Sequence, residues 1–400
     1  MSKNNSILKY ISKAVWILSL ISLLTDMASE MLYPIMPIYL KSIGFSIVLI
    51  GILEGIAEAT AGLSKGYFGK FSDNTGRRAP FVQTGYALSA ISKPMMAVFI
   101  YPAWIFFART IDRIGKGVRT GARDAILSDE ARPETKGKIF GFHRSMDTLG
   151  AVLGPALALI YLHYYPQDYK TLFFIAFIPG ILAVFVSFYL KDKKTELPEI
   201  RERTSFFSFT GYWKNSPEAY RKLVIGLLVF ALFNSSDTFL LLRAKQAGLD
   251  DSMVIMLYIF YNLIFALFAF PMGIIADKIG LKTIFICGLT LFAIVYLGIS
   301  QELNLYLYFG LFFMYGIYAS ATEGISKAWI SNISEKKDVA TAIGTYSGFQ
   351  SICAMLASTF TGLIWYNFGS EATFITTSLI TFLVIIYFLR IPGPRVKTAD

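Results

Sequence analysis

The chain has 400 residues, of which 55% are hydrophobic and only 16% charged. Soluble domains carry about 25% charged residues, so this composition excludes an ordinary soluble protein and predicts one that crosses a membrane several times. Two cysteines and two histidines exclude a disulfide framework and a metal cage built on such ligands. The net charge of +10 lies largely in short loops, which is typical of membrane topology rather than of nucleic-acid binding.

Twelve apolar segments are long enough to cross a bilayer, which takes roughly 17–25 residues each. In chain order they lie at 14–40, 46–69, 80–101, 104–128, 138–163, 171–190, 222–246, 252–276, 282–300, 304–330, 339–366 and 372–391. A polar stretch separates the sixth segment from the seventh. We therefore predict an all-α membrane protein with two pseudo-symmetric six-helix halves, 1–190 and 222–400, joined by a loop at 191–221.

Lysine and arginine are unevenly distributed among the connections between these spans. One set of connections, which includes both chain ends and the loop at 191–221, holds most of them. The opposite set holds little beyond Lys41, Lys170 and Lys245. Because cytoplasmic loops carry the excess of basic residues, we expect both termini and the loop at 191–221 to be cytoplasmic. The expected location is the cell membrane, where the protein would be a multi-pass protein.

The first two spans carry carboxylates at helical spacing. Asp26 and Glu30 lie four residues apart in the first span, and Glu54 and Glu58 repeat the spacing in the second. Residues at i and i+4 share one face of a helix. A charge at the bilayer centre costs about 2.5–3.5 kcal/mol on the insertion scale, so such residues are functional candidates. We predict that Asp26 and Glu30 bind and release a proton, with Glu54 and Glu58 as further candidates for proton coupling.

Charged residues also line one face of the span at 104–128. At 100° per residue, six side chains fall within about a third of the helix circumference: Arg109, Asp112, Arg113, Lys116, Thr120 and Arg123. A charged stripe of this length cannot face lipid. We expect Arg109, Asp112 and Arg113 to take part in proton coupling. The competing interpretation is structural ion pairing, because acids and bases nearly balance in this half. His143, one turn before Asp147, is interpreted as such a structural pair.

Two loops repeat one pattern 204 residues apart (273 minus 69). Residues 69–81 read GKFSDNTGRRAPF and residues 273–285 read GIIADKIGLKTIF. Together with the two six-span halves, the first loop resembles the signature loop of the major facilitator superfamily of secondary transporters. The resemblance implies a charge latch that stabilises the outward-open state. The residues that carry it are Gly69, Asp73, Gly76, Arg77 and Arg78, with Gly273, Asp277 and Gly280 in the second copy.

Glycines recur along the span at 138–163 ahead of a proline. Small residues let helix backbones approach closely, and a proline inside a helix removes a backbone hydrogen bond. The pattern is similar to the antiporter motif of the superfamily's proton-driven exporters, and the Pro-x-x-Pro segment at Pro34 and Pro37 resembles the first helix of its twelve-helix drug:proton antiporters. The motif residues are Gly141, Gly150, Gly154 and Pro155.

The resemblance implies a central cavity between the halves, lined by the first, fourth, seventh and tenth spans. The side chains that we predict to bind substrate combine charge, amide and aromatic character: Tyr33, Arg113, Lys116, Asn234, Asp237, Tyr346 and Gln350. We expect a monomeric, proton-coupled exporter of small organic molecules, either drugs or metabolites, that works by alternating access. The proton gradient would take the place of a cofactor, and we predict no metal site.

Other functions remain open at this point. The arginine stripe of 104–128 would also suit a transporter of small organic anions or organophosphates, because arginine binds carboxylate and phosphate groups with two hydrogen bonds. The intramembrane acids would also allow export of a metal or metal chelate. A sensor or scaffold on the same fold is a further class. The sequence shows no phosphate-binding loop for ATP and no catalytic constellation, so we do not expect an enzyme.

Overall fold

The computed structural model describes residues 11–192, 210–249, 251–301 and 304–391, and the regular secondary structure within these ranges consists of helices. The first half of the chain forms α1 (Lys13–Leu32), α2 (Met36–Ser42), α3 (Ile47–Thr75), α4 (Ala79–Val98), α5 (Pro102–Asp129), α6 (Lys136–Tyr164) and α7 (Tyr169–Ser187). The second half forms α8 (Thr210–Asn215), α9 (Glu218–Phe233), α10 (Asp237–Gln246), α11 (Asp251–Ile279), α12 (Leu281–Ile299), α13 (Leu305–Ile333) and α14 (Val339–Arg390).

Four predicted spans are interrupted or merged in the structure. The first span divides into α1 and α2, with Pro37 in the first turn of α2. The seventh divides into α9 and α10 around Asn234, whose backbone is extended. The last two predicted spans form one continuous element, α14, in which Gly369 has non-helical dihedral angles. The break between α1 and α2 lies at the Pro-x-x-Pro segment that begins with Pro34.

Apolar character is high enough for membrane crossing in most of these elements. Within the described residues, eight helical stretches are long and apolar enough to cross a bilayer. The charged helix α5 is not among them, although it is 28 residues long. Its charges must therefore be shielded by neighbouring helices rather than by lipid.

The internal repeat is visible in the backbone. Gly44 and Gly248 have φ angles of 96° and 94°, and Gly76 and Gly280 have φ angles of 63° and 103°. Each pair is separated by the same 204 residues that relate the two sequence patterns. Positive φ is accessible to glycine at little cost. The two halves therefore place a glycine with positive φ at equivalent positions of the chain.

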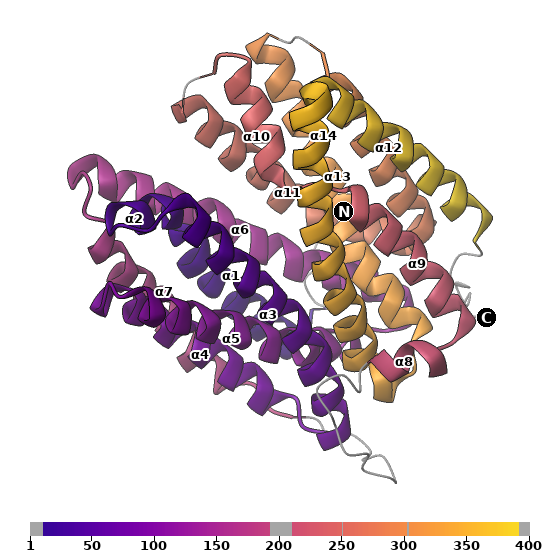
Figure 1. Ribbon diagram of the computed structural model, residues 1–400. Helices are drawn as coiled ribbons and strands as arrows, with labels where there is room; N and C mark the ends of the chain where they lie inside the picture. The colour runs from indigo at the N-terminus through magenta and orange to yellow at the C-terminus, as the bar shows by residue number, and fades with distance from the viewer. Residues whose placement is uncertain (1–10, 193–209, 250, 302–303, 392–400) are drawn as a thin grey trace, which may run out of the picture.

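The helices form two groups that meet at one end of the molecule. In Figure 1 the indigo-to-magenta helices of the first half lie against the red-to-yellow helices of the second around α14, and the groups diverge towards α2 and α10. Glycines allow the approach: a Cβ on Gly69 of α3 would lie 2.5 Å from the Ala340 carbonyl oxygen of α14, and one on Gly141 of α6 would lie 2.5 Å from the Ala269 carbonyl oxygen of α11. We call this junction the closed end.

Candidate functional site

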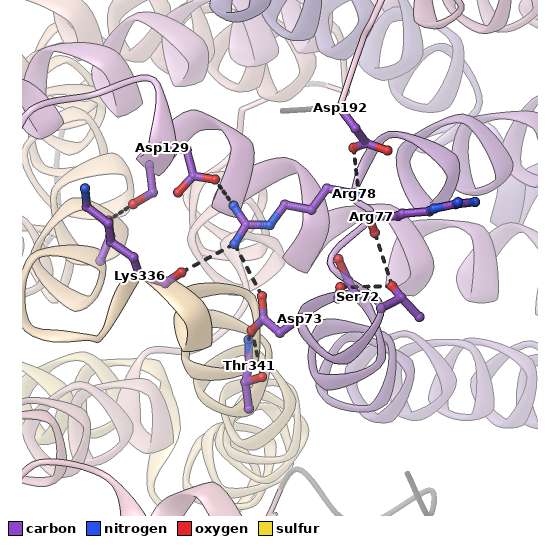
Figure 2. Close-up of polar contacts among 11 residues, drawn as sticks. Ser72, Asp73, Arg77, Arg78, Asp129, Asp192, Lys336 and Thr341 are labelled. Atoms are coloured by element: carbon purple, nitrogen blue, oxygen red, sulfur yellow. Dashed lines mark hydrogen bonds and ion pairs between the residues drawn. The ribbon is translucent and has the colours of Figure 1, made fainter. Parts of the chain in front are cut away.

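At the closed end, a buried carboxylate of the first half binds the start of a helix of the second half. One Asp73 oxygen accepts hydrogen bonds from the Thr341 backbone N–H at 2.7 Å and from its hydroxyl at 2.8 Å. Thr341 lies in the first turn of α14, where backbone N–H groups lack helical partners and the helix dipole favours a negative charge. Figure 2 shows this contact. Asp73 thus stabilises the junction between the halves.

Arg78 completes this contact from the same loop. Its guanidinium lies 3.4 Å from the other Asp73 oxygen, pairs with Asp129 at the end of α5, and donates to the Lys336 carbonyl oxygen of the second half at 3.4 Å. The Arg77 side chain points away from Asp73 (Figure 2) and is exposed. Of the two arginines predicted for the latch, the structure therefore places Arg78 in it and Arg77 outside it.

The second copy of the pattern makes the reciprocal contact. The two carboxylate oxygens of Asp277 accept from the backbone N–H groups of Gly137 and Lys138, each at 2.7 Å, at the start of α6. A Cβ on Gly137 would lie 2.7 Å from the Gly273 backbone carbonyl oxygen, so glycine is required there. Each half therefore caps a helix of the other with the aspartate of its own repeat. Lys136 adds a 2.7 Å hydrogen bond to the Ser331 carbonyl oxygen.

The two acids of the first helix lie at the contact between α1 and α6. A Cβ on Gly150 would lie 3.1 Å from the Asp26 Cβ, and one on Gly154 would lie 3.2 Å from the Glu30 carbonyl carbon. Two glycines of the antiporter motif therefore bring α6 onto the backbone of α1 beside both carboxylates. The third, Gly141, packs instead on α11, as described above. Pro155 is buried inside α6, directly after Gly154.

Both acids are half-buried, and Glu30 reaches the second half. The Tyr258 hydroxyl of α11 donates to a Glu30 oxygen at 3.2 Å. Lys116 of α5 lies close enough to act electrostatically on Asp26 and Glu30 and also on Glu58. Lys116, whose side chain is exposed, therefore acts on three acids of the first half. The Glu54 side chain lies outside the described part of the structure.

Much of the stripe on α5 is engaged in ion pairs within the first half. Asp112 lies 2.8 Å from the Lys93 ammonium of α4 and within 3.6 Å of the guanidinium groups of Arg109 and Arg113. Arg113 also lies 3.3 Å from Glu58 of α3. In this part of the stripe the charged side chains are therefore arranged as ion pairs, as the structural interpretation expects. Lys116 has no ion pair with any described residue within 4 Å.

The break between α9 and α10 places two polar side chains among tyrosines. Asp237, in the first turn of α10, accepts hydrogen bonds from the hydroxyls of Tyr261 and Tyr315. The Asn234 amide donates to the Tyr318 hydroxyl at 3.2 Å. The two predicted residues are therefore brought together with α11 and α13. A carboxylate ringed by aromatic hydroxyls is suited to contact a cationic or aromatic molecule.

The remaining predicted substrate residues lie in different environments. Tyr33 is 50% exposed at the break between α1 and α2. Tyr346 is 5% exposed and belongs to the hydrophobic core, whereas Gln350, one turn later, is exposed. Their proximity along α14 therefore does not place both side chains in the same environment.

A cluster of charges between the halves was not predicted. Arg144 of α6 lies 2.5 Å from Asp147 and pairs with Glu323 of α13, while Lys327 of α13 lies 2.8 Å from Asp124 of α5. The spacing of Glu323 and Lys327, four residues apart in an apolar span, was the available signal. Their partners are far away in the sequence and carry no pattern of their own.

The environment of His143 differs from the predicted structural pair with Asp147. It lines a small cavity of this cluster together with Arg123, Asp124 and Asp147. The imidazole is 4% exposed, and neither ring nitrogen has a hydrogen-bond partner among the described residues. The predicted satisfied structural pair with Asp147 is therefore wrong, because Asp147 instead accepts from Arg144 and from the Ser22 hydroxyl.

Two groups of apolar helices that cap each other at one end, with ionisable side chains buried between them, define a membrane transporter rather than an enzyme. The sequence matches the family model of the Major Facilitator Superfamily over residues 18–260 and 223–400. The chain belongs to this superfamily. The resemblance inferred from its loops and glycines is therefore confirmed.

Relatives and solved structures agree with this assignment. An uncharacterised MFS-type transporter of Methanocaldococcus jannaschii is 32% identical over 391 residues, which are 96% of each chain. A multidrug resistance protein of Cronobacter sakazakii is 26% identical over 133 residues, 33% of each chain. The structure of a human organic anion transporter has a TM-score of 0.78 at 16% identity, covering 94% of this chain and 98% of that one. This structural similarity shows that the chain and the human transporter share a fold.

Proposed function

We propose that the protein exports small organic molecules in exchange for protons by alternating access. The observation that carries the proposal is the position of Asp26 and Glu30 on the glycine face of α6. There both acids lie at a helix contact, and Glu30 also contacts Tyr258 of the other half. Carboxylates in such a place change their proton affinity when the halves move apart, because solvation and partners both change.

The proposed topology has twelve membrane-spanning helices, with α1 and α2, and α9 and α10, each acting as one span and α14 as two. Residues 1–190 and 222–400 are the proposed domains, joined by 191–221. The closed end holds basic residues such as Arg78, Lys136 and Lys336, so we place it, both termini and the central loop on the cytoplasmic side of the cell membrane. The structure then corresponds to an outward-facing state of a monomer.

The charges between the halves favour a cationic or neutral aromatic substrate. Asp237 with its tyrosines offers a carboxylate and ring faces. The guanidinium groups of Arg109 and Arg113 already lie beside acids. The partial similarity to a multidrug resistance protein supports the same choice.

A second candidate is the transport of an organic anion. Lys116 favours it, because its exposed ammonium makes no ion pair with a described residue. The fold shared with a human organic anion transporter is compatible with either substrate. The two candidates differ in the sign of the charge that the cavity must attract, so they are separable by experiment.

The test is proton flux in proteoliposomes that contain a pH-sensitive dye. A pH gradient is imposed, and matched panels of organic cations and anions are added. We expect cations to collapse the gradient with the wild type and not with Asp26→Asn, which keeps the size of the side chain but cannot ionise. Glu218→Gln is the control, because Glu218 is exposed and pairs only with Lys222 of its own helix among the described residues.

Collapse by anions alone, abolished by Lys116→Gln, would replace the first candidate with the second. Transport of either panel without any change in dye signal would refute proton coupling. Unchanged collapse in Asp26→Asn would remove Asp26 from the proton pathway.

A further inference from the structure

A second acid lies against Asp26. Asp147 is one turn before Gly150 in α6, and Gly150 packs beside the Asp26 Cβ. The two carboxyl side chains lie close enough to share a hydrogen bond when one of them carries a proton. Asp147 is 5% exposed. A hydrogen bond between two carboxyl groups requires one proton, and two adjacent carboxylates in a site of low polarity do not both ionise readily.

Asp147 is also tied to the opposite half through one arginine. The Arg144 guanidinium lies 2.5 Å from one Asp147 oxygen and pairs at the same time with Glu323 of α13. It also lies over the Phe265 ring of α11, 5.0 Å from the centroid. Arg144 is therefore a side chain of the first half that is held on two elements of the second.

The charged and polar groups that face this pair come from four elements. Beside the pair and Arg144 they are Ser22 and Glu30 of α1, Lys116, Arg123 and Asp124 of α5, His143 of α6, and Glu323 and Lys327 of α13. Glu323 and Lys327 belong to the second half and move with it. Glu323 contacts Arg144, whereas Lys327 contacts Asp124, so Glu323 acts on the pair more directly.

We propose that Asp26 and Asp147 together hold one exchangeable proton, and that Arg144 couples its release to the opening of the closed end. This inference rests on the proposed function. When the closed end is shut, Glu323 offsets the charge of Arg144 and the pair keeps its proton. When the second half moves away, Arg144 faces the pair without Glu323. Its positive charge then favours the ionised pair, and the proton leaves towards the side that has just opened.

The experiment is an infrared pH titration of the purified protein in lipid nanodiscs, following the band of protonated carboxyl groups. The probe is the proton itself, so no substrate is needed. Replacement of Asp147 by asparagine removes the neighbouring negative charge. We expect the midpoint of the Asp26 band to fall by about one pH unit or more in Asp147→Asn, which corresponds to a tenfold loss of proton affinity.

Glu323→Gln is the second variant, and it tests the coupling. The Glu323 side chain is 49% exposed, so its replacement leaves the packing of the helices in place. We expect the midpoint to fall in the same direction, because Arg144 loses the charge that offsets it. Glu218→Gln should leave the midpoint unchanged. An unchanged midpoint in Asp147→Asn would overturn the shared proton, and an unchanged or higher midpoint in Glu323→Gln would overturn the role of Arg144.

The titration tests the shared proton and the flux measurement tests the proposed function, so either proposal can be refuted without the other. If the midpoints move as expected but transport carries no proton, the paired site stands and the proposed function falls. If protons flow with substrate but Asp147→Asn titrates like the wild type, the proposed function stands and this inference falls.

Discussion

At the residue scale, single aspartates hold the halves together by accepting hydrogen bonds from helix starts. Asp73 bonds Thr341 of the other half. Asp192, just after the first half, makes a comparable contact with that half alone, accepting from the backbone N–H groups of Arg78 and Ala79 at 2.9 and 2.7 Å. The chemistry is similar, but only the first contact must break when the closed end opens. This difference separates a latch from an ordinary helix cap.

Asp73→Asn should therefore loosen the closed end. The substitution removes the charge from two hydrogen bonds and one ion pair, and hydrogen bonds to charged groups contribute about 1.5–3 kcal/mol each. We expect faster thiol labelling of Ser331→Cys, which lies buried at the junction, in a background without Cys287 and Cys353. Asp192→Asn is the matched control and should label at the parent rate. Equal labelling of Asp73→Asn and the parent would show that Asp73 does not hold the junction.

At the element scale, α6 packs closely against both α1 and α11. Its glycines remove side chains where backbones meet, and a methyl group at Gly154 would lie 2.7 Å from the Met31 backbone nitrogen. Gly310 of α13 offers a contrast, because nothing lies within 4 Å of the equivalent position. Both glycines are within helices, so alanine has the same intrinsic preference at each.

Gly154→Ala should lower the thermal stability of the purified protein, because the added methyl group forces α6 away from α1. Overpacking of this kind costs typically 1–3 kcal/mol. Gly310→Ala should be neutral or slightly stabilising, since alanine is the better helix former by roughly 1 kcal/mol. Thermal unfolding followed by tryptophan fluorescence measures both. Equal melting temperatures for the two variants would contradict the close contact of α6 with α1.

The helices were largely predictable from the sequence, whereas the charge pairs were not. Apolar runs and loop charges placed most helix ends within a few residues, because membrane crossing imposes length and composition directly. The latch was found through its repeat, but the choice of Arg78 over Arg77 depends on how the loop turns at Gly76. The ion pair between Arg144 and Glu323 depends on the packing of α6 against α13. The spacing of residues in the sequence does not indicate this packing.

At the scale of the whole molecule, the account requires that protonation and the arrangement of the halves depend on each other. Contacts between the halves concentrate at the closed end, through Asp73, Asp277 and Lys136. Of the acids at the contact of α1 with α6, Glu30 is linked to the break in α9–α10: it accepts from Tyr258, whose ring packs on Tyr261, and Tyr261 donates to Asp237. A change of charge there would alter contacts on both sides of the interface.

Distances between spin labels at the two ends, measured as a function of pH, test this claim most directly. One pair replaces the exposed Arg77 and Lys337 at the closed end, and the other replaces the exposed Lys41 and Ala247 at the opposite end. The account predicts that acidification lengthens one distance while it shortens the other, and that Asp26→Asn removes this dependence on pH. Distances that stay constant across the titration, or that change equally in Asp26→Asn, would contradict it.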